Sequence, residues 1–182
     1  MKKQSYSETI PAGIATSISV TTMVQAAMIA AIYVVLTFIA NAFGLANYAV
    51  QVRFSEALTI LPYFTPAAIP GLFIGCLLSN ILTGCALPDI IFGSLATLIG
   101  ALGTYALRKW KWCTPVCPII SNMIIVPLVL IYGYGLLIEG FSVIQCFGYY
   151  CLTVGAGEVI SCGILGMILL YTLEKYRSRI FV

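Results

Sequence analysis

The chain contains no histidine and few charged residues. Of its 182 residues, only 8% are charged, with nine lysines or arginines and six aspartates or glutamates. The lack of histidine excludes Ser-His and Cys-His nucleophiles, a histidine proton shuttle and most zinc sites. A soluble domain could not cover its surface with so few charged side chains. The sequence is 61% hydrophobic and predicts an integral membrane protein that forms a single domain over residues 1–182.

Two further chemistries find little support. Glycine-rich phosphate loops are absent, so nucleotide hydrolysis would have to come from a partner. The number of cysteines is odd, at seven. Cys113 and Cys117 are expected to be ordinary reduced thiols, whereas Cys85, Cys146 and Cys151 lie toward one side of the membrane, where pairing is possible but weakly supported.

Apolar runs of spanning length recur along nearly the whole chain. They predict helices at about 22–43, 54–65, 67–84, 89–107, 116–136 and 148–173. The second run is short and is followed by several prolines, so this helix could begin at membrane depth and join the third through a tight proline turn. We therefore predict an all-α bundle of six transmembrane helices, with five as the alternative.

Basic residues indicate the orientation. Eight of the nine lie near the N-terminus, in the connection between the fourth and fifth predicted helices or near the C-terminus: Lys2, Lys3, Arg108, Lys109, Lys111, Lys175, Arg177 and Arg179. Six spans place these regions on one side, which the positive-inside rule makes cytoplasmic. We therefore expect an uncleaved first helix, a cytoplasmic N-terminal segment at 1–20 and a cytoplasmic tail at 174–182.

Glu158 lies in the middle of the last predicted helix, where a carboxylate costs about 2.5–3.5 kcal/mol on insertion scales. No basic residue neighbours it in the sequence and both helix ends are distant, so the acid indicates a binding role. Arg53 and Glu56 are three residues apart, and they could form either an interfacial ion pair or part of a site. Asp89 could be either a favourable acid at a helix N-terminus or a site residue.

Depth brings these polar residues together. At 1.5 Å per residue, Glu158 should lie about 15 Å below the outer end of its helix. Asn80, Asp89, Arg53 and Glu56 are also expected in the outer half of the membrane. Small residues share the helix faces that carry Glu158 and Asp89, and such residues either pack helices closely or leave room for a ligand. The sequence thus predicts a cavity in the outer half of the bundle.

The first predicted helix, TTMVQAAMIAAIYVVLTFIA, contains two overlapping Ala-x-x-x-Ala pairs. Ala26 pairs with Ala30 and Ala27 pairs with Ala31, which produces a flat stripe of small residues. Such a stripe serves either internal packing or docking onto another membrane protein. The two pairs lie about 100° apart around the helix, so they need not behave alike.

Several stretches together resemble a known family: VRFSEALTILPYF, AIPGLFIGCLLSNIL, PDIIFGSLATLIGA and GEVISCGILG. They are similar to the substrate-binding S component of energy-coupling factor (ECF) transporters, in the branch assigned to queuosine precursors. The resemblance covers most of the chain from about residue 20 onward. It implies a subunit of a bacterial plasma-membrane importer that binds a deazaguanine base such as preQ1 or queuine. Its partners would be a membrane scaffold subunit (EcfT) and two cytoplasmic ATPases (EcfA), while the chain itself would be no enzyme and need no cofactor or metal.

A deazaguanine suggests a role for each candidate residue. Glu158 could accept hydrogen bonds from the ring N–H and the exocyclic amine together. A cationic aminomethyl group would need a second acid, for which Asp89 or Glu56 could serve, and Asn80 could meet the ring carbonyl. Tyr149 and Tyr150 are further candidates, which would either stack on the base or belong to the interfacial aromatic belt. Asn122 would either line the pocket or bond another helix, and its position favours the second role.

Two other functions remain open from the sequence alone. A small proton-coupled secondary transporter acting as a dimer would use Glu158 as its coupling acid. A structural or assembly protein would pair Glu158 with a partner helix and bind no ligand. An S component for a different vitamin-like substrate is a further variant of the first hypothesis.

Overall fold

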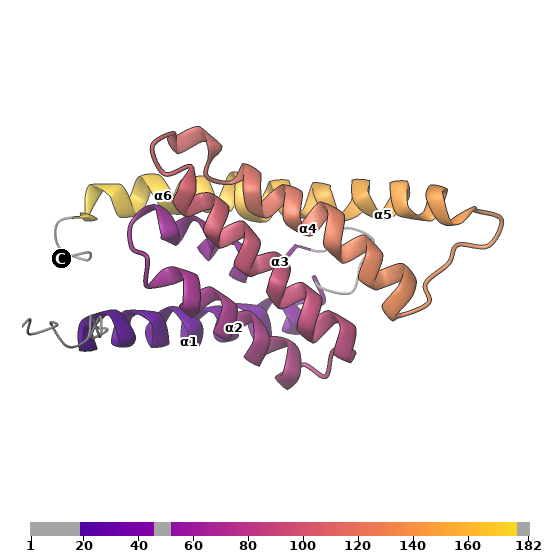
Figure 1. Cartoon of the computed structure of the whole chain (residues 1–182), viewed down its shortest axis with the longest axis horizontal. Coiled ribbons are helices and arrows are strands. Elements are labelled where there is room, and N and C mark those ends of the chain that lie inside the picture. Colours follow the sequence, from indigo (N-terminus) through magenta and orange to yellow (C-terminus); the bar gives the residue numbers. More distant parts are fainter. Residues whose placement is uncertain (1–18, 46–51, 178–182) are drawn as a thin grey trace, which may run out of the picture.

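The computed structural model describes residues 19–45 and 52–177, and these are helical apart from short connections (Figure 1). The elements are α1 (Val20–Ala42), η1 (Phe54–Tyr63), α2 (Ala68–Leu82), α3 (Leu87–Ala106), η2 (Lys111–Cys113), α4 (Val116–Leu128), η3 (Val129–Gly133), α5 (Val143–Glu158), η4 (Val159–Leu165) and α6 (Gly166–Lys175). The predicted all-α class is confirmed. Lys2, Lys3 and Arg179 lie outside the described residues.

Four helices in the described part of the chain are long and apolar enough to cross a membrane. They cover Val20–Ala42, Leu87–Ala106, Lys111–Gly133 and Val143–Lys175, and α2 is a shorter apolar helix. These segments agree with five of the six predicted helices in position. The structure therefore supports a multi-pass membrane protein, while the number of six spans stays a prediction.

The second predicted helix is a 3-10 helix, η1, rather than an α-helix. Every residue from Ser55 to Tyr63 is buried, and η1 contacts α1, α2, α3, η4 and α6. Its ten residues rise about 20 Å, too little to cross the hydrocarbon alone. Non-α backbone at membrane depth is tolerated where protein surrounds it, as it does here. A short turn that contains Pro66 joins η1 to α2, as the sequence predicted.

Both ends of the described chain lie at one end of the bundle. Figure 1 shows the start of α1, the connection between α3 and α4, and the end of α6 at this same end. An ion pair of 2.6 Å between Lys111 and Glu174 links the last two of these regions. This arrangement agrees with the clustering of basic residues in the sequence, and their cytoplasmic location stays a prediction.

The last helix is one continuous rod from Val143 to Lys175 and begins five residues before the predicted start at 148. A capping box explains the difference. The Ser142 hydroxyl accepts from the Gln145 N–H, and the Gln145 side chain accepts from the Ser142 N–H. Glu158 ends α5, 16 residues long, so it lies about 22 Å from the helix start rather than 15 Å. The π-helical segment η4 follows it directly.

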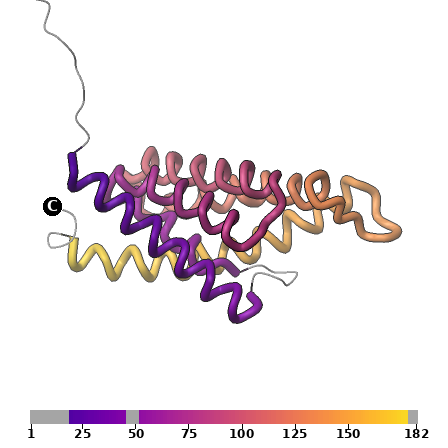
Figure 2. The backbone as a smooth tube through the Cα atoms, turned by 90° about the horizontal axis from the view of Figure 1, so that it is seen from below, coloured from indigo at the N-terminus to yellow at the C-terminus, as the bar shows by residue number. Residues whose placement is uncertain are grey.

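Close packing joins α1 to α2. A Cβ atom on Gly71 would lie 2.7 Å from the Ala26 carbonyl oxygen, and one on Gly75 would lie 3.0 Å from the Ala30 Cα. Glycine is therefore needed at both positions to let the helices approach. The opposite side of α1 is free: only 22% of its most apolar window is buried, against 39–44% for the other three spans. In Figure 2 this helix crosses the outside of the bundle.

Candidate functional site

A cavity of about 540 Å³ lies in the half of the bundle opposite the start of α1 and the end of α6. Its walls come from α1, the start of η1, the end of α2, the start of α3, and the region from α4 to the following loop. The lining residues are Thr37, Ala40, Asn41, Arg53, Asn80, Thr83, Cys85, Asp89, Val126, Leu130, Tyr134 and Leu136. Three residues predicted from the sequence, Arg53, Asn80 and Asp89, thus meet in one cavity.

Asp89 presents a carboxylate to this cavity. It lies in the first turn of α3, where the helix dipole favours an acid, and is 7% exposed. Tyr134 donates to its Oδ2 at 3.3 Å, and Asn80 donates to its backbone carbonyl at 3.3 Å. No other donor to the Asp89 carboxylate occurs among the described residues. Its oxygens therefore retain capacity to accept bonds from a ligand.

Arg53 stands at the entry to η1. Its backbone N–H donates to the Ser161 hydroxyl at 3.1 Å, which ties this point of the chain to η4. The Arg53 and Glu56 side chains form no ion pair, which leaves the other alternative, that both belong to a site, as the prediction. The cause is the direction of the two side chains: Arg53 faces the cavity and interacts electrostatically with Asp89, while Glu56 points into the bundle.

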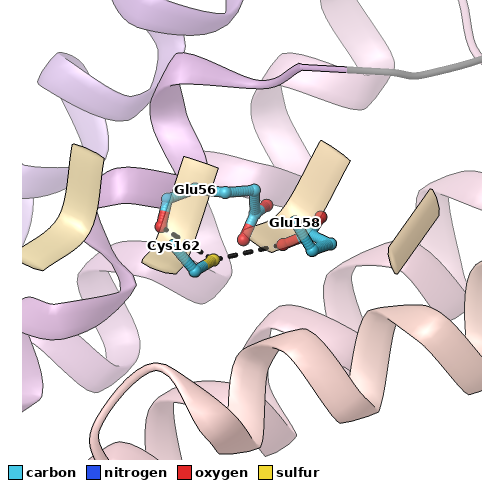
Figure 3. A group of neighbouring side chains, drawn as sticks. All are labelled: Glu56, Glu158 and Cys162. Carbon is cyan, nitrogen blue, oxygen red and sulfur yellow. Dashed lines mark hydrogen bonds between the residues drawn. The ribbon is translucent and has the colours of Figure 1, made fainter. Parts of the chain in front are cut away.

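A second group of polar residues is buried in the bundle and does not belong to the residues that line the cavity. Glu56 follows Arg53 in η1, and Glu158 and Cys162 come from the last helix. Figure 3 shows the two carboxylates pointing toward one another beside the Cys162 sulfur, and one oxygen of each lies within 4.8 Å of the other and of this sulfur. The three residues are 1%, 5% and 0% exposed. We call them the deep cluster.

The hydrogen bonds of the deep cluster fix its shape. The Cys162 sulfur lies 3.1 Å from Glu158 Oε2 and 3.4 Å from the Glu56 carbonyl oxygen, so its single proton can bond either acceptor. Tyr33 donates to Glu56 Oε1, and the Thr97 hydroxyl lies 3.5 Å from the same oxygen. Side chains from α1 and α3 thereby hold one edge of the Glu56 carboxylate.

Two polar atoms of this region have no partner among the described residues. They are Glu56 Oε2 and the Asn122 side-chain nitrogen, and both are buried. The Asn122 side chain lies near the carboxylates of Glu56 and Glu158, but its nitrogen makes no hydrogen bond of normal geometry to either. A buried polar group without a partner costs about 1–3 kcal/mol. These orphaned atoms indicate that a ligand with both donors and acceptors could complete the hydrogen bonding.

The deep cluster has donor atoms that could also hold a metal ion. Two carboxylates and a thiolate form a mixed hard and soft set, which suits several divalent transition metals and selects none of them sharply. The same oxygens are acceptors for N–H groups of an organic ligand. The orphaned Asn122 nitrogen is a donor, which fits an organic ligand better than a cation.

Comparison with known proteins identifies the family. The family model described as QueT transporter matches residues 23–175. The chain belongs to the QueT transporter family. It is also 35% identical over 90 residues to the "Queuosine precursor transporter QueT" of Lactococcus lactis subsp. cremoris (strain MG1363), an alignment that covers 49% of this chain and 53% of that protein. The chain therefore spans about half the length of this curated relative, and no solved structure matches.

The resemblance inferred from the sequence is thus confirmed at the level of the QueT family. This is a family of transporters rather than enzymes, as the sequence predicted. The family membership does not assign roles to individual residues. These roles rest on the geometry of the cavity and the deep cluster.

Asn122 is placed differently from the sequence interpretation. It was expected nearer the cytoplasmic end and bonded to another helix. It lies instead near the middle of the span Lys111–Gly133, and its side chain is 3% exposed beside the two buried glutamates. Its nitrogen has no hydrogen bond of normal geometry to a described residue, so both roles, lining a pocket and bonding another helix, stay predictions.

Tyr149 and Tyr150 do not line the cavity. Their rings contact each other edge to face at 5.6 Å, and Tyr149 is 41% exposed. Both lie near the start of α5, more than a turn above Glu158. This geometry agrees with the aromatic-belt alternative rather than with stacking on a ligand.

The two alanine pairs of α1 have different environments, because they lie on different faces of the helix. Ala26 and Ala30 pack against Gly71 and Gly75 of α2, which favours the internal-packing alternative for this pair. Ala27 and Ala31 are exposed on the other side of the helix. They remain available for contact with a partner.

Sequence reasoning missed several residues of the site. Tyr33, Thr97 and Tyr134 donate to the acids, yet each is an ordinary residue in an apolar helix or loop, and no spacing pattern marks it. Cys162 could have been found, because it lies four residues after Glu158 on the same helical face. All seven cysteines are free, so the possible pairing among Cys85, Cys146 and Cys151 does not occur.

Proposed function

We propose that this chain is the high-affinity substrate-binding subunit of an ECF-type importer for a queuosine precursor, a deazaguanine base such as preQ1 or queuine. Membership of the QueT family and the name of the Lactococcus relative support this proposal. The observation that carries it is Glu158: a carboxylate 5% exposed in mid-helix, facing a second buried acid. The described residues form no ion pair with either acid.

A deazaguanine has the chemistry to stabilise this arrangement. Its ring N–H and exocyclic amine stand side by side, and the Glu158 carboxylate accepts both in a charge-assisted pair. Such bonds contribute about 1.5–3 kcal/mol each, enough to offset the cost of burying the acid. Asn80, at the cavity wall, meets the ring carbonyl with its amide.

Asp89 is the acid proposed for a cationic aminomethyl group. It faces the cavity and retains free acceptor capacity, whereas Glu56 is committed to Tyr33 on one edge. The two anionic regions thus divide the ligand: the deep cluster binds the base edge, and Asp89 binds the substituent. Arg53 balances part of the negative charge of the cavity.

The partners are a membrane scaffold subunit, EcfT, and two cytoplasmic ATPases, EcfA. The exposed face of α1 that carries Ala27 and Ala31 would dock on EcfT, because small side chains let a partner helix approach closely. In this proposal the chain crosses the bacterial plasma membrane six times, and both termini are cytoplasmic, as the positive-inside rule favours.

The test is a binding titration of the purified chain in detergent or nanodiscs with preQ1, its nitrile, queuine, the nucleoside and guanine. Saturable binding of at least one deazaguanine, tighter than that of guanine, supports the proposal. Absence of binding to every compound contradicts it. Uptake by the chain alone in vesicles, driven by a proton gradient, would instead favour the secondary transporter.

A further inference from the structure

The spacing of the two acids in the deep cluster carries more information than the presence of Glu158 alone. One oxygen of Glu56 and one of Glu158 lie within 4.8 Å of each other. The carboxylates point toward one another in Figure 3, and the Cys162 sulfur lies to one side of them. Glu56 Oε2 has no partner among the described residues and is fully buried.

An upper limit of 4.8 Å between two carboxylate oxygens is close to the span of a single amino group bound on both sides. An NH₂ group on a flat ring directs its two hydrogens about 120° apart, and each bond to an acceptor is about 2.9 Å long, so the two acceptors stand about 5 Å apart. Two acids that serve well-separated groups of a ligand would have no reason to lie so close. Two buried carboxylates at this distance repel unless donors lie between them.

We propose that Glu56 and Glu158 clamp the exocyclic amine of the ligand, each accepting one of its two hydrogens. This inference rests on the proposed function and makes Glu56 a second specificity-determining residue of the same site. Glu158 accepts the ring N–H as well as the first amine hydrogen. Glu56 accepts the second amine hydrogen at Oε2.

The surroundings of Glu56 suit this role. Tyr33 and Thr97, from α1 and α3, engage Oε1 and leave Oε2 as the free edge of the carboxylate. The Asn122 nitrogen, also without a partner among the described residues, lies near both acids and donates to the unprotonated ring nitrogen beside the amine. Glu56 Oε2 and the Asn122 nitrogen thus match the amine and the ring nitrogen beside it, which are neighbours on one edge of the base.

The clamp predicts discrimination by the amine itself. A base without this group leaves two buried acids facing each other unpaired, which costs more than the loss of one bond. A methyl group on the amine removes only the hydrogen directed at Glu56, because the other hydrogen and the ring N–H still reach Glu158. The methylated compound therefore isolates the contribution of Glu56.

The experiment compares 7-deazaguanine, its N2-methyl derivative and 7-deazahypoxanthine on the full-length chain, by titration. The wild-type protein should bind the methylated base about 10- to 150-fold more weakly than 7-deazaguanine, and 7-deazahypoxanthine more weakly still. In Glu56→Gln the preference over the methylated base should shrink to about threefold or less, because the amide oxygen stays on the Tyr33 donor and the NH₂ group then faces the amine. Glu158→Gln is the matched control: it should weaken both compounds and keep their ratio.

Equal binding of 7-deazaguanine and its methyl derivative by the wild-type protein would overturn the clamp while leaving the proposed function intact. An undiminished preference in Glu56→Gln would do the same. The ligand series on the wild-type protein decides the question even if Glu56→Gln does not fold. Failure of every deazaguanine to bind would remove the proposed function, and the clamp with it.

Discussion

The Cys162 sulfur lies 3.1 Å from Glu158 Oε2, one turn earlier in the same helix. It also lies 3.3 Å from the Thr59 hydroxyl of η1. Cys162 therefore links the mid-membrane acid to the short helix that carries the second acid. Ser161 and Cys162 both lie in the π-helical segment η4 and contact η1 or the residue before it. The Ser161 hydroxyl accepts a hydrogen bond from the Arg53 backbone N–H. The site is thus built where the last helix departs from α-helical geometry, as π-helical turns often are at functional sites.

Replacing the central acid should separate binding from stability. Glu158→Gln keeps the size of the side chain but loses one charged acceptor and turns an amide donor toward the donors of the base. We expect affinity for the best deazaguanine ligand to fall by about 2–4 kcal/mol, roughly 30- to 1000-fold. The ligand-free protein should be no less stable to heat, because an uncompensated buried charge is removed. An unfolded variant whose folded fraction binds normally would assign Glu158 to helix packing.

The two alanine pairs should respond differently to bulk. Ala27→Trp, on the exposed side of α1, should abolish ATP-driven uptake by the complete transporter and leave ligand binding by the isolated chain unchanged. Ala30→Trp is the control, since Ala30 is 7% exposed and faces Gly75. It should lower the thermal stability of the isolated chain. Normal uptake by Ala27→Trp would show that the scaffold docks elsewhere.

The close contact between α1 and α2 should not accommodate a side chain at Gly75. A Cβ at position 75 would lie 2.8 Å from the Tyr33 Cβ, so Gly75→Ala should destabilise the chain by about 1–3 kcal/mol. It should also weaken ligand binding, because Tyr33 holds Glu56. Gly148→Ala is the matched substitution: apart from the backbone of its own helix, its added Cβ meets nothing within 4 Å, so stability should stay equal or rise by about 0.5–1 kcal/mol. Thermal unfolding of both variants checks the contrast.

Asp89 should favour the binding of a base that carries a cationic substituent. Asp89→Asn should weaken binding of the aminomethyl base by about 1.5–3 kcal/mol and of the uncharged nitrile by much less, as titrations of both compounds would reveal. Tyr134→Phe is the companion variant. It removes the donor to Asp89 at 3.3 Å but keeps the carboxylate, so the preference for the cationic compound should persist. Equal losses for both compounds in Asp89→Asn would exclude a contact with the amine.

Some candidate site residues could be predicted because polar side chains in apolar helices are costly to bury and are therefore conspicuous in the sequence. Glu158 stands out in an apolar helix, and Asp89 and Asn80 interrupt otherwise apolar runs. Tyr33, Thr97 and Tyr134 could not be identified in this way, since hydroxyl residues are common in such helices and their partners lie 23, 41 and 45 residues away in the chain. The two alternatives for Arg53 and Glu56 could not be separated from the sequence, because spacing alone cannot tell which way a 3-10 helix turns its side chains.

By itself, the sequence determined the class of protein, the positions of five of the helices, and the family. Apolar runs of spanning length and the rarity of charge suffice for this, because the cost of polar groups in hydrocarbon acts on each residue locally. Only the tertiary structure decided that Ala26 and Ala30 pack inside while Ala27 and Ala31 stay exposed, and that Glu56 faces Glu158. Those outcomes depend on which helix lies against which face, and a close approach such as that of Gly75 to Ala30 exists only after the chain has folded.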